Sequence, residues 1–177
     1  MTIYIVLLRG INVGKHNRIK MAELKSLLET MGLTKVKTYI QSGNVLFEAK
    51  GDAPQLSQQL EDEISKTFGF PVPVILRTAE EYEQIIRDCP YSIDSLKEGE
   101  SIQLAFFADE PSQDKMETLL SYNSNPDKCF INRKEVYLLL RQSILDSKLA
   151  AQLPKLGVPV TVRNWKTVIK LSTMVER

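Results

Sequence analysis

The sequence predicts an α+β fold built from two ferredoxin-like subdomains, each with an antiparallel sheet that carries helices on one face, and a C-terminal helix. Two observations predict this class. The first half alternates strand and helix patterns in the order βαββαβ, and the second half repeats that order loosely. The 177 residues are 43% hydrophobic, which is enough for a packed core. We therefore expect residues 1–89 to form one subdomain with a linking helix, and residues 90–177 to form the second with the C-terminal helix.

The first half begins with a continuous apolar run, which is typical of a strand buried on both faces. Glycine and proline then separate segments of helical and alternating periodicity. The predicted elements are a strand over residues 3–8, a helix over 20–31, a hairpin of strands over 36–41 and 44–48, a helix over 52–68 and a strand over 72–76.

The second half follows a linking helix over residues 78–89 and a polar connector over 90–99. Its predicted elements are a strand over residues 102–107, a helix over 111–122, a hairpin of strands over 128–132 and 135–141, one short helix over 143–153, a strand over 158–162 and a helix over 164–175. The order suggests a duplicated unit, although the pattern shows no residue-level repeat.

The topology of the first half predicts where a ligand would lie. If the first strand runs upward, the hairpin tip at residues 41–44 and the loop over residues 9–20 end at the same edge of the sheet. Both segments are polar and rich in small residues, and loops at one end of a sheet often form ligand sites.

The loop over residues 9–20 is a candidate anion site, because it delivers cations and glycines to the start of a helix. It lacks the spacing and the Ser or Thr of a Walker A motif. A plain turn with Asn caps is the alternative interpretation. The candidate residues are Arg9, Asn12, Gly14, Lys15, Asn17, Arg18 and Lys20.

The hairpin tip contributes Gln41, Ser42 and Asn44 to the same candidate site. Turn chemistry alone explains Gly43 and Asn44, since both tolerate positive φ. Lining of a pocket opposite Arg9 is the alternative that would use all three polar side chains.

The C-terminal segment carries a basic edge next to the single tryptophan. We expect Arg163, Asn164 and Lys170 to lie against the same mouth as the N-terminal loop, with Trp165 reporting on the site. The alternative is that Trp165 only packs the last helix onto the body of the protein.

The charge distribution, the cysteine content and the apolar runs limit the kind of protein and the cellular compartment. The net charge is +1, but residues 1–50 carry +5, residues 51–153 carry −8 and residues 154–177 carry +4. Cys89 and Cys129 have no metal-ligand spacing, and they fit a reducing cytoplasm as small core residues. The apolar run at residues 3–8 is too short to span a bilayer, so we expect a cytoplasmic protein without a membrane partner.

Three separated motifs resemble a widespread bacterial domain family of unknown function: RGINVG at residues 9–14, YIQSGNV at residues 39–45 and RNWKTVIKL at residues 163–171. The resemblance covers nearly the whole chain and implies an α+β fold with ferredoxin-like subdomains, without implying an activity. One position departs from the family pattern, which usually has a second glycine after Gly14 where this chain has Lys15.

Three functional hypotheses follow. The first is a binding module for a small phosphorylated or carboxylated ligand at the loops of the sheet end. The second is a nucleic-acid-binding protein that uses its basic termini, although the aromatic motif of RNA-binding sheets is missing. The third is an enzyme, for which the sequence offers no catalytic residues, metal ligands or cofactor motif. The sequence leaves the oligomeric state open.

Overall fold

The structure is a computed structural model that describes residues 1–123 and 126–175. The chain divides into two compact units, Met1–Gln84 with Lys170–Arg177, and Ile85–Ile169. The division expected from the sequence put the whole C-terminal helix in the second half. In the structure, residues 170–175 group with the first unit instead.

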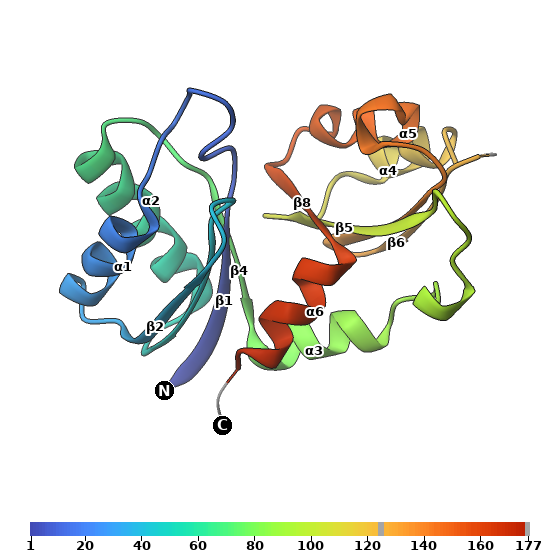
Figure 1. Cartoon of the computed structure of the whole chain (residues 1–177). Helices are drawn as coiled ribbons and strands as arrows, with labels where there is room; N and C mark the ends of the chain where they lie inside the picture. The colour runs from blue at the N-terminus through green and yellow to red at the C-terminus, as the bar shows by residue number, and fades with distance from the viewer. Residues whose placement is uncertain (124–125, 176–177) are drawn as a thin grey trace. The chain divides into compact units, whose positions relative to one another are not determined.

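The first unit has the predicted ferredoxin-like topology (Figure 1). Its sheet has the order β2-β3-β1-β4, and all neighbouring strands are antiparallel. Helices α1 and α2 lie on the same side of this sheet. The elements are β1 (Thr2–Leu8), α1 (Met21–Thr30), β2 (Thr34–Tyr39), β3 (Asn44–Ala49), α2 (Ala53–Phe68) and β4 (Val74–Thr78).

The core of the first unit forms because the apolar side chains of strands and helices share one face. Tyr4, Val6 and Leu8 of β1 alternate onto the same side as Val45 and Phe47 of β3, and all five are buried. Helix α1 contributes its predicted apolar face, and helix α2 begins at an Asp52 cap and ends at Gly69 in the left-handed conformation.

The second unit repeats this topology with the strand order β6-β7-β5-β8. Helix α3 (Ala79–Arg87) and the short turn η1 (Ile93–Ser95) precede its sheet, and α6 (Trp165–Thr173) follows its sheet. Its own elements are β5 (Ser101–Phe107), α4 (Gln113–Leu120), β6 (Lys128–Asn132), β7 (Glu135–Leu140), η2 (Ile144–Asp146), α5 (Lys148–Ala151), η3 (Leu153–Leu156) and β8 (Val160–Asn164).

The single short helix expected over residues 143–153 is wrong. The structure has three short turns there, η2, α5 and η3. The side chain of Ser143 accepts from the Leu145 amide, and that of Ser147 accepts from the Ala150 amide, so each serine starts a new turn. Pro154 then restricts how the chain continues.

A residue-level repeat, which sequence inspection missed, marks the two units as equivalent. Residues 72–77 read VPVILR and residues 158–163 read VPVTVR, and each segment includes all but the final residue of the last strand in its unit. The Pro73 carbonyl accepts from the Arg9 amide at 3.0 Å, and the Pro159 carbonyl accepts from the Ala108 amide at 2.9 Å. In each unit, the proline at the equivalent position therefore holds the residue that directly follows the first strand of the sheet.

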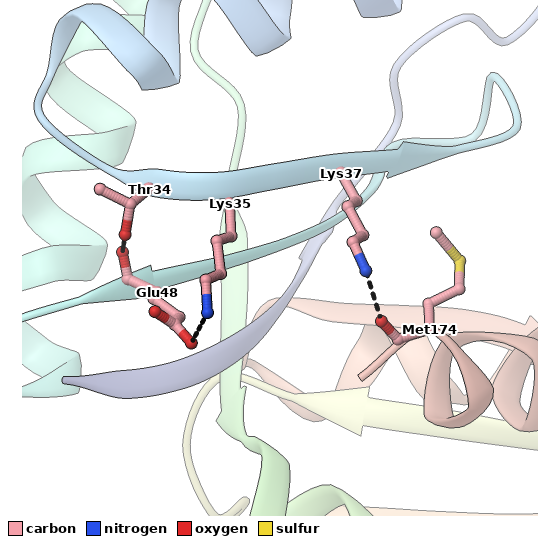
Figure 2. Close-up of polar contacts among 5 residues, drawn as sticks. All are labelled: Thr34, Lys35, Lys37, Glu48 and Met174. Atoms are coloured by element: carbon pink, nitrogen blue, oxygen red, sulfur yellow. Dashed lines mark hydrogen bonds and ion pairs between the residues drawn. The ribbon is translucent and has the colours of Figure 1, made fainter. Parts of the chain in front are cut away.

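The C-terminal segment is joined to the first unit through the edge strand β2 (Figure 2). The Lys37 ammonium donates to the Met174 carbonyl at 3.1 Å, just beyond the end of α6. A cation at this point suits the negative end of a helix. Along the same strand, Lys35 forms an ion pair of 3.3 Å with Glu48 of β3.

Candidate functional site

The loop over residues 9–20 and the hairpin tip over residues 41–44 lie together, as the topology predicts, and one side chain joins them. The Asn12 amide group donates to the Gln41 carbonyl at 2.7 Å and to the Ile19 carbonyl at 2.9 Å. The Asn12 side-chain oxygen accepts from the Ile19 amide at 2.8 Å. Asn12 therefore fixes both the shape of the loop and its position on the hairpin.

The distal part of the loop is a small hairpin of its own. The Asn12 amide donates to the Asn17 carbonyl at 3.0 Å, and the His16 amide donates to the Val13 carbonyl at 3.2 Å. Asn12, Gly14 and Asn17 all have positive φ angles, which Gly and Asn adopt more readily than other residues. The positive φ angles of Asn12 and Asn17 favour the alternative interpretation, in which the asparagines shape a turn.

The base of the loop is anchored in the core. Ile11 and Ile19 are each 2% exposed and pack in the core of the first unit. Gly43 of the hairpin tip lies so close to Ile11 and Leu8 that a Cβ atom at this position would stand 2.9 Å from Ile11 Cδ1 and 2.8 Å from Leu8 Cβ. Its φ of +90° also disfavours any side chain. The hairpin tip therefore needs glycine for packing as well as for turn geometry.

Two of the polar residues at the hairpin tip have contacts within the turn. Asn44 is fully buried, and its side chain donates to the Tyr39 carbonyl and to Ser42 Oγ, both at 3.0 Å. These contacts favour the turn interpretation for Asn44 and Ser42. The Gln41 side chain is exposed, and its carbonyl receives the bond from Asn12.

The loop carries four cations. Arg9, Lys15, Arg18 and Lys20 are all exposed. Arg18 donates to the Gly14 carbonyl at 3.1 Å, which holds its guanidinium over the loop. Among the described residues, no carboxylate forms an ion pair with any of the four. The loop thus concentrates positive charge that the protein itself does not neutralise.

Two exposed aliphatic side chains, one in the loop and one directly before the hairpin tip, were not predicted from the sequence as part of the site. Val13 is 66% exposed and Ile40 is 49% exposed. Each is one residue away from the Asn12–Gln41 hydrogen bond. Ile40 also has a φ of 50°, an unfavourable conformation for a β-branched residue. An isoleucine directly before the QSG turn is the sequence signal that could have identified this position.

The C-terminal candidates lie at the end of β8 and in α6. Arg163 is buried in β8, and its guanidinium donates to Thr161 Oγ1 and to the Val162 carbonyl. Asn164 caps the helix by accepting from the Thr167 amide at 2.9 Å, and Lys170 is exposed. These contacts give Arg163 and Asn164 local structural roles. Their membership of the ligand site stays a prediction.

Reactive groups are few in the described part of the chain. His16 is exposed in the loop, and burial raises the pKa of Cys129 to about 11. Over residues 1–123 and 126–175, no group of three His, Cys, Asp or Glu residues is arranged to hold a metal ion. Within the same residues, none of the helices has both the length and the apolar composition to cross a bilayer.

Comparison with known proteins gives a family for this arrangement. The family model described as Protein of unknown function (DUF1697) matches residues 1–137. The chain belongs to this family. The match includes the loop, the hairpin tip, the whole first sheet, and β5 and β6 of the second sheet, so the N-terminal part of the candidate site lies inside the part that this DUF1697 chain shares with its family.

Two solved structures are similar to this DUF1697 chain to different degrees. A conserved bacterial protein, SP0830 from Streptococcus pneumoniae, has 27% sequence identity and a TM-score of 0.80, with 99% of each chain covered. An unknown protein from Galdieria sulphuraria has 9% identity and a TM-score of 0.28, with 92% of this chain and 98% of that chain covered. Comparison with the curated proteins gave no match. The similarity to SP0830 extends over both units.

Proposed function

We propose that the protein binds a small phosphorylated or carboxylated ligand, in the cytoplasm, at the end of the first sheet. One observation carries this proposal: the loop over residues 9–20 is fixed by Asn12 onto the hairpin tip and displays four exposed cations without a carboxylate partner. A rigid loop reduces the entropy cost of ordering these side chains around an anion.

The start of α1 adds donors to this charge. Lys20 occupies the N-cap position, and no side chain caps the helix there. The first amides of a helix lack partners within the helix, and the helix dipole favours an anion near them. Arg9 and Arg18 can each donate two parallel hydrogen bonds to phosphate or carboxylate oxygens. The ligand class is therefore an anion with several oxygens.

The second unit offers an internal comparison that supports a ligand role for the loop. At the equivalent connection, residues 108–112 lead directly from β5 to α4, and they include Asp109 and Glu110 in place of cations. The same strand order forms there without a long basic loop. The fold itself therefore does not require the loop over residues 9–20 to be long or cationic.

The other two hypotheses have less support. The aromatic residues of the central strands, Tyr4 and Phe47, are 3% and 1% exposed in the helix-covered core. The opposite side of β1 carries Ile3, Ile5 and Leu7, which cannot stack on bases as aromatic side chains do. An enzymatic reaction would need a reactive group beside the loop, and His16, the single histidine of the chain, is the candidate there.

Thermal unfolding with inorganic phosphate and pyrophosphate tests the proposal. At ten times its Kd a ligand stabilises the folded state by about 1.4 kcal/mol, which raises Tm by about 3–6 °C for a chain of this size. We expect this rise for the wild type and its loss in Arg9→Ala and Arg18→Ala. Lys50→Ala, which removes an exposed lysine away from the loop, is the control and should behave as the wild type. An equal rise in all four proteins, or in none, would refute the proposal.

A further inference from the structure

We propose a second binding surface in the first unit: the groove between α1 and α2 binds a basic amphipathic segment of a partner protein. This surface is separate from the cationic loop, and it has the opposite charge. The proposal is independent of the anion site.

Two hollows form the groove. One of about 520 Å³ lies between the length of α1 and the C-terminal end of α2, where Thr67 and Phe68 line it. Another of about 440 Å³ lies between the C-terminal end of α1 and the middle of α2, where Gln59 and Glu63 line it. Leu27 and Thr30 line both hollows, so the two are neighbours along the antiparallel helices, and together they are called the groove below.

The walls of the groove are made of small and polar side chains at helical spacing. Ala22, Ser26 and Thr30 follow one another at intervals of four on α1, which places them on one face of the helix. The Thr30 hydroxyl donates to the Ser26 carbonyl at 2.9 Å, so it does not need a partner from outside. This wall leaves room for a second element to approach α1 closely.

The floor of the groove is apolar. Leu27, Met31 and Phe68 are half-buried, and they pack on the core of the first unit while still lining the hollows. Methionine adapts its shape to different side chains, as at surfaces that bind amphipathic helices. A partner that inserts apolar side chains here would complete the burial of these three residues.

The charge of the groove selects the partner. Three carboxylates line it, from Glu23 of α1 and from Asp62 and Glu63 of α2. No Lys, Arg or His residue is among the described residues that line either hollow. The groove is therefore acidic although residues 1–50 as a whole carry +5. A segment that combines Lys or Arg with apolar residues matches both the floor and the rim.

The length of the groove fits a short helix. Helix α1 has 10 residues, which corresponds to about 15 Å at 1.5 Å per residue. A partner helix of about three turns would place two or three apolar side chains over the floor. Its basic residues would then face the three carboxylates.

Binding of a labelled synthetic peptide to the full-length chain tests this inference. The probe is a helical peptide of Leu and Lys with an amphipathic pattern, and the matched control is the same pattern of Leu and Glu. We expect saturable fluorescence anisotropy with the Leu/Lys peptide at low salt and none with the Leu/Glu peptide. Amide resonances of Ala22, Ser26 and Thr30 should shift during the titration.

Variants of the groove make the test specific. The double variant Glu23→Lys with Glu63→Lys should lower the affinity for the Leu/Lys peptide at least about tenfold, because it reverses the charge of the rim. Ser26→Trp should do the same by filling the groove without changing its charge. Glu29→Lys changes the charge of α1 at an exposed position outside the groove, and it should stay within about twofold of the wild type.

Three results would overturn the inference. The first is the absence of binding by the Leu/Lys peptide. The second is unchanged affinity in Ser26→Trp, or resonance shifts that fall on other elements. The third is a dimer in sedimentation that Ser26→Trp dissolves, because a second copy of the chain would then be the occupant in place of a different partner.

Discussion

Gly43 meets two separate constraints at the tip of the β2–β3 hairpin. Its φ is +90°, and an added Cβ would stand 2.8 Å from Leu8 Cβ, which cannot move without the strand. Gly43→Ala is expected to cost about 2–5 kcal/mol, from a left-handed conformation and from overpacking. Urea unfolding measures this cost.

Gly51→Ala is the matched control for this variant. Gly51 has a φ of +103°, but its nearest contact for an added Cβ is the flexible Gln55 side chain at 3.9 Å. Gly51→Ala should therefore lower the free energy of unfolding only through the left-handed backbone conformation, by about 1 kcal/mol. Equal losses in the two variants would show that the close approach of Gly43 to Leu8 and Ile11 does not matter for stability.

Asn12 and Asn17 form a second matched pair, because both have positive φ and lie in the same loop. The Asn12 side chain makes three hydrogen bonds of 2.7–2.9 Å, whereas Asn17 makes one of 3.3 Å to the Gly10 carbonyl. Since a net hydrogen bond contributes about 1 kcal/mol, Asn12→Ala should cost about 2 kcal/mol more than Asn17→Ala in urea unfolding. Similar losses would mean that the loop is not fixed through Asn12.

The sequence predicted the neighbourhood of these residues but not their individual roles. Topology alone brings residues 9–20 to the hairpin tip. Whether Asn44 lines a pocket or bonds within its turn depends on a rotamer and on burial, which no spacing rule reveals. Val13 and Ile40 were missed because exposed aliphatic residues have no periodic signature when they stand alone in loops.

At the scale of elements, strong periodicity predicted most helices and strands, while local side-chain capping overrode the weakest pattern. Residues 143–153 have helical spacing, yet Ser143 and Ser147 each cap a new short turn. The repeat of VPVILR and VPVTVR was missed because the elements between the two copies differ in length and composition. The structure shows the equivalence through matching hydrogen bonds.

Asp127 joins three elements of the second unit, and its titration should govern the acid stability of this region. One carboxylate oxygen accepts from the Arg141 amide at 2.8 Å, and the other accepts from Gln142 at 2.7 Å. Burial by itself raises the pKa of Asp127, but the hydrogen bonds from Arg141, Gln142 and Ser147 outweigh it and lower the pKa below the ordinary value.

The sign of the pH dependence follows from this lowered pKa. The stabilisation by Asp127 is complete above the unfolded-state pKa of about 3.9 and is lost as the pH falls through the lower folded-state pKa. Asp127→Asn should lower the free energy of unfolding by about 2 kcal/mol at pH 7. Below a pH of about 4, the variant should lose less stability than the wild type does. Asp146→Asn, at an exposed site near the same region, should change neither quantity measurably. The measurement is urea unfolding at a series of pH values.

At the scale of the whole molecule, the chain passes between its two units inside helices. Helix α3 begins in the first unit and ends in the second, and α6 begins in the second and ends in the first. A helix loses hydrogen bonds in adjacent turns together, so neither unit can unfold without shortening both connections. The bond from Lys37 to the Met174 carbonyl adds a contact that holds the end of α6 in the first unit.

We therefore expect one cooperative unfolding transition for the 177 residues, although the chain contains two sheets with separate cores. Trp165, the single tryptophan, begins α6 within the second unit, whereas far-UV circular dichroism follows both units. Their urea transitions should coincide for the wild type. Lys37→Met, which removes the ammonium group from the first unit, should shift both transitions by the same amount. A Trp165 transition that stays unchanged while the circular dichroism splits into two steps would mean that α3 and α6 do not couple the units.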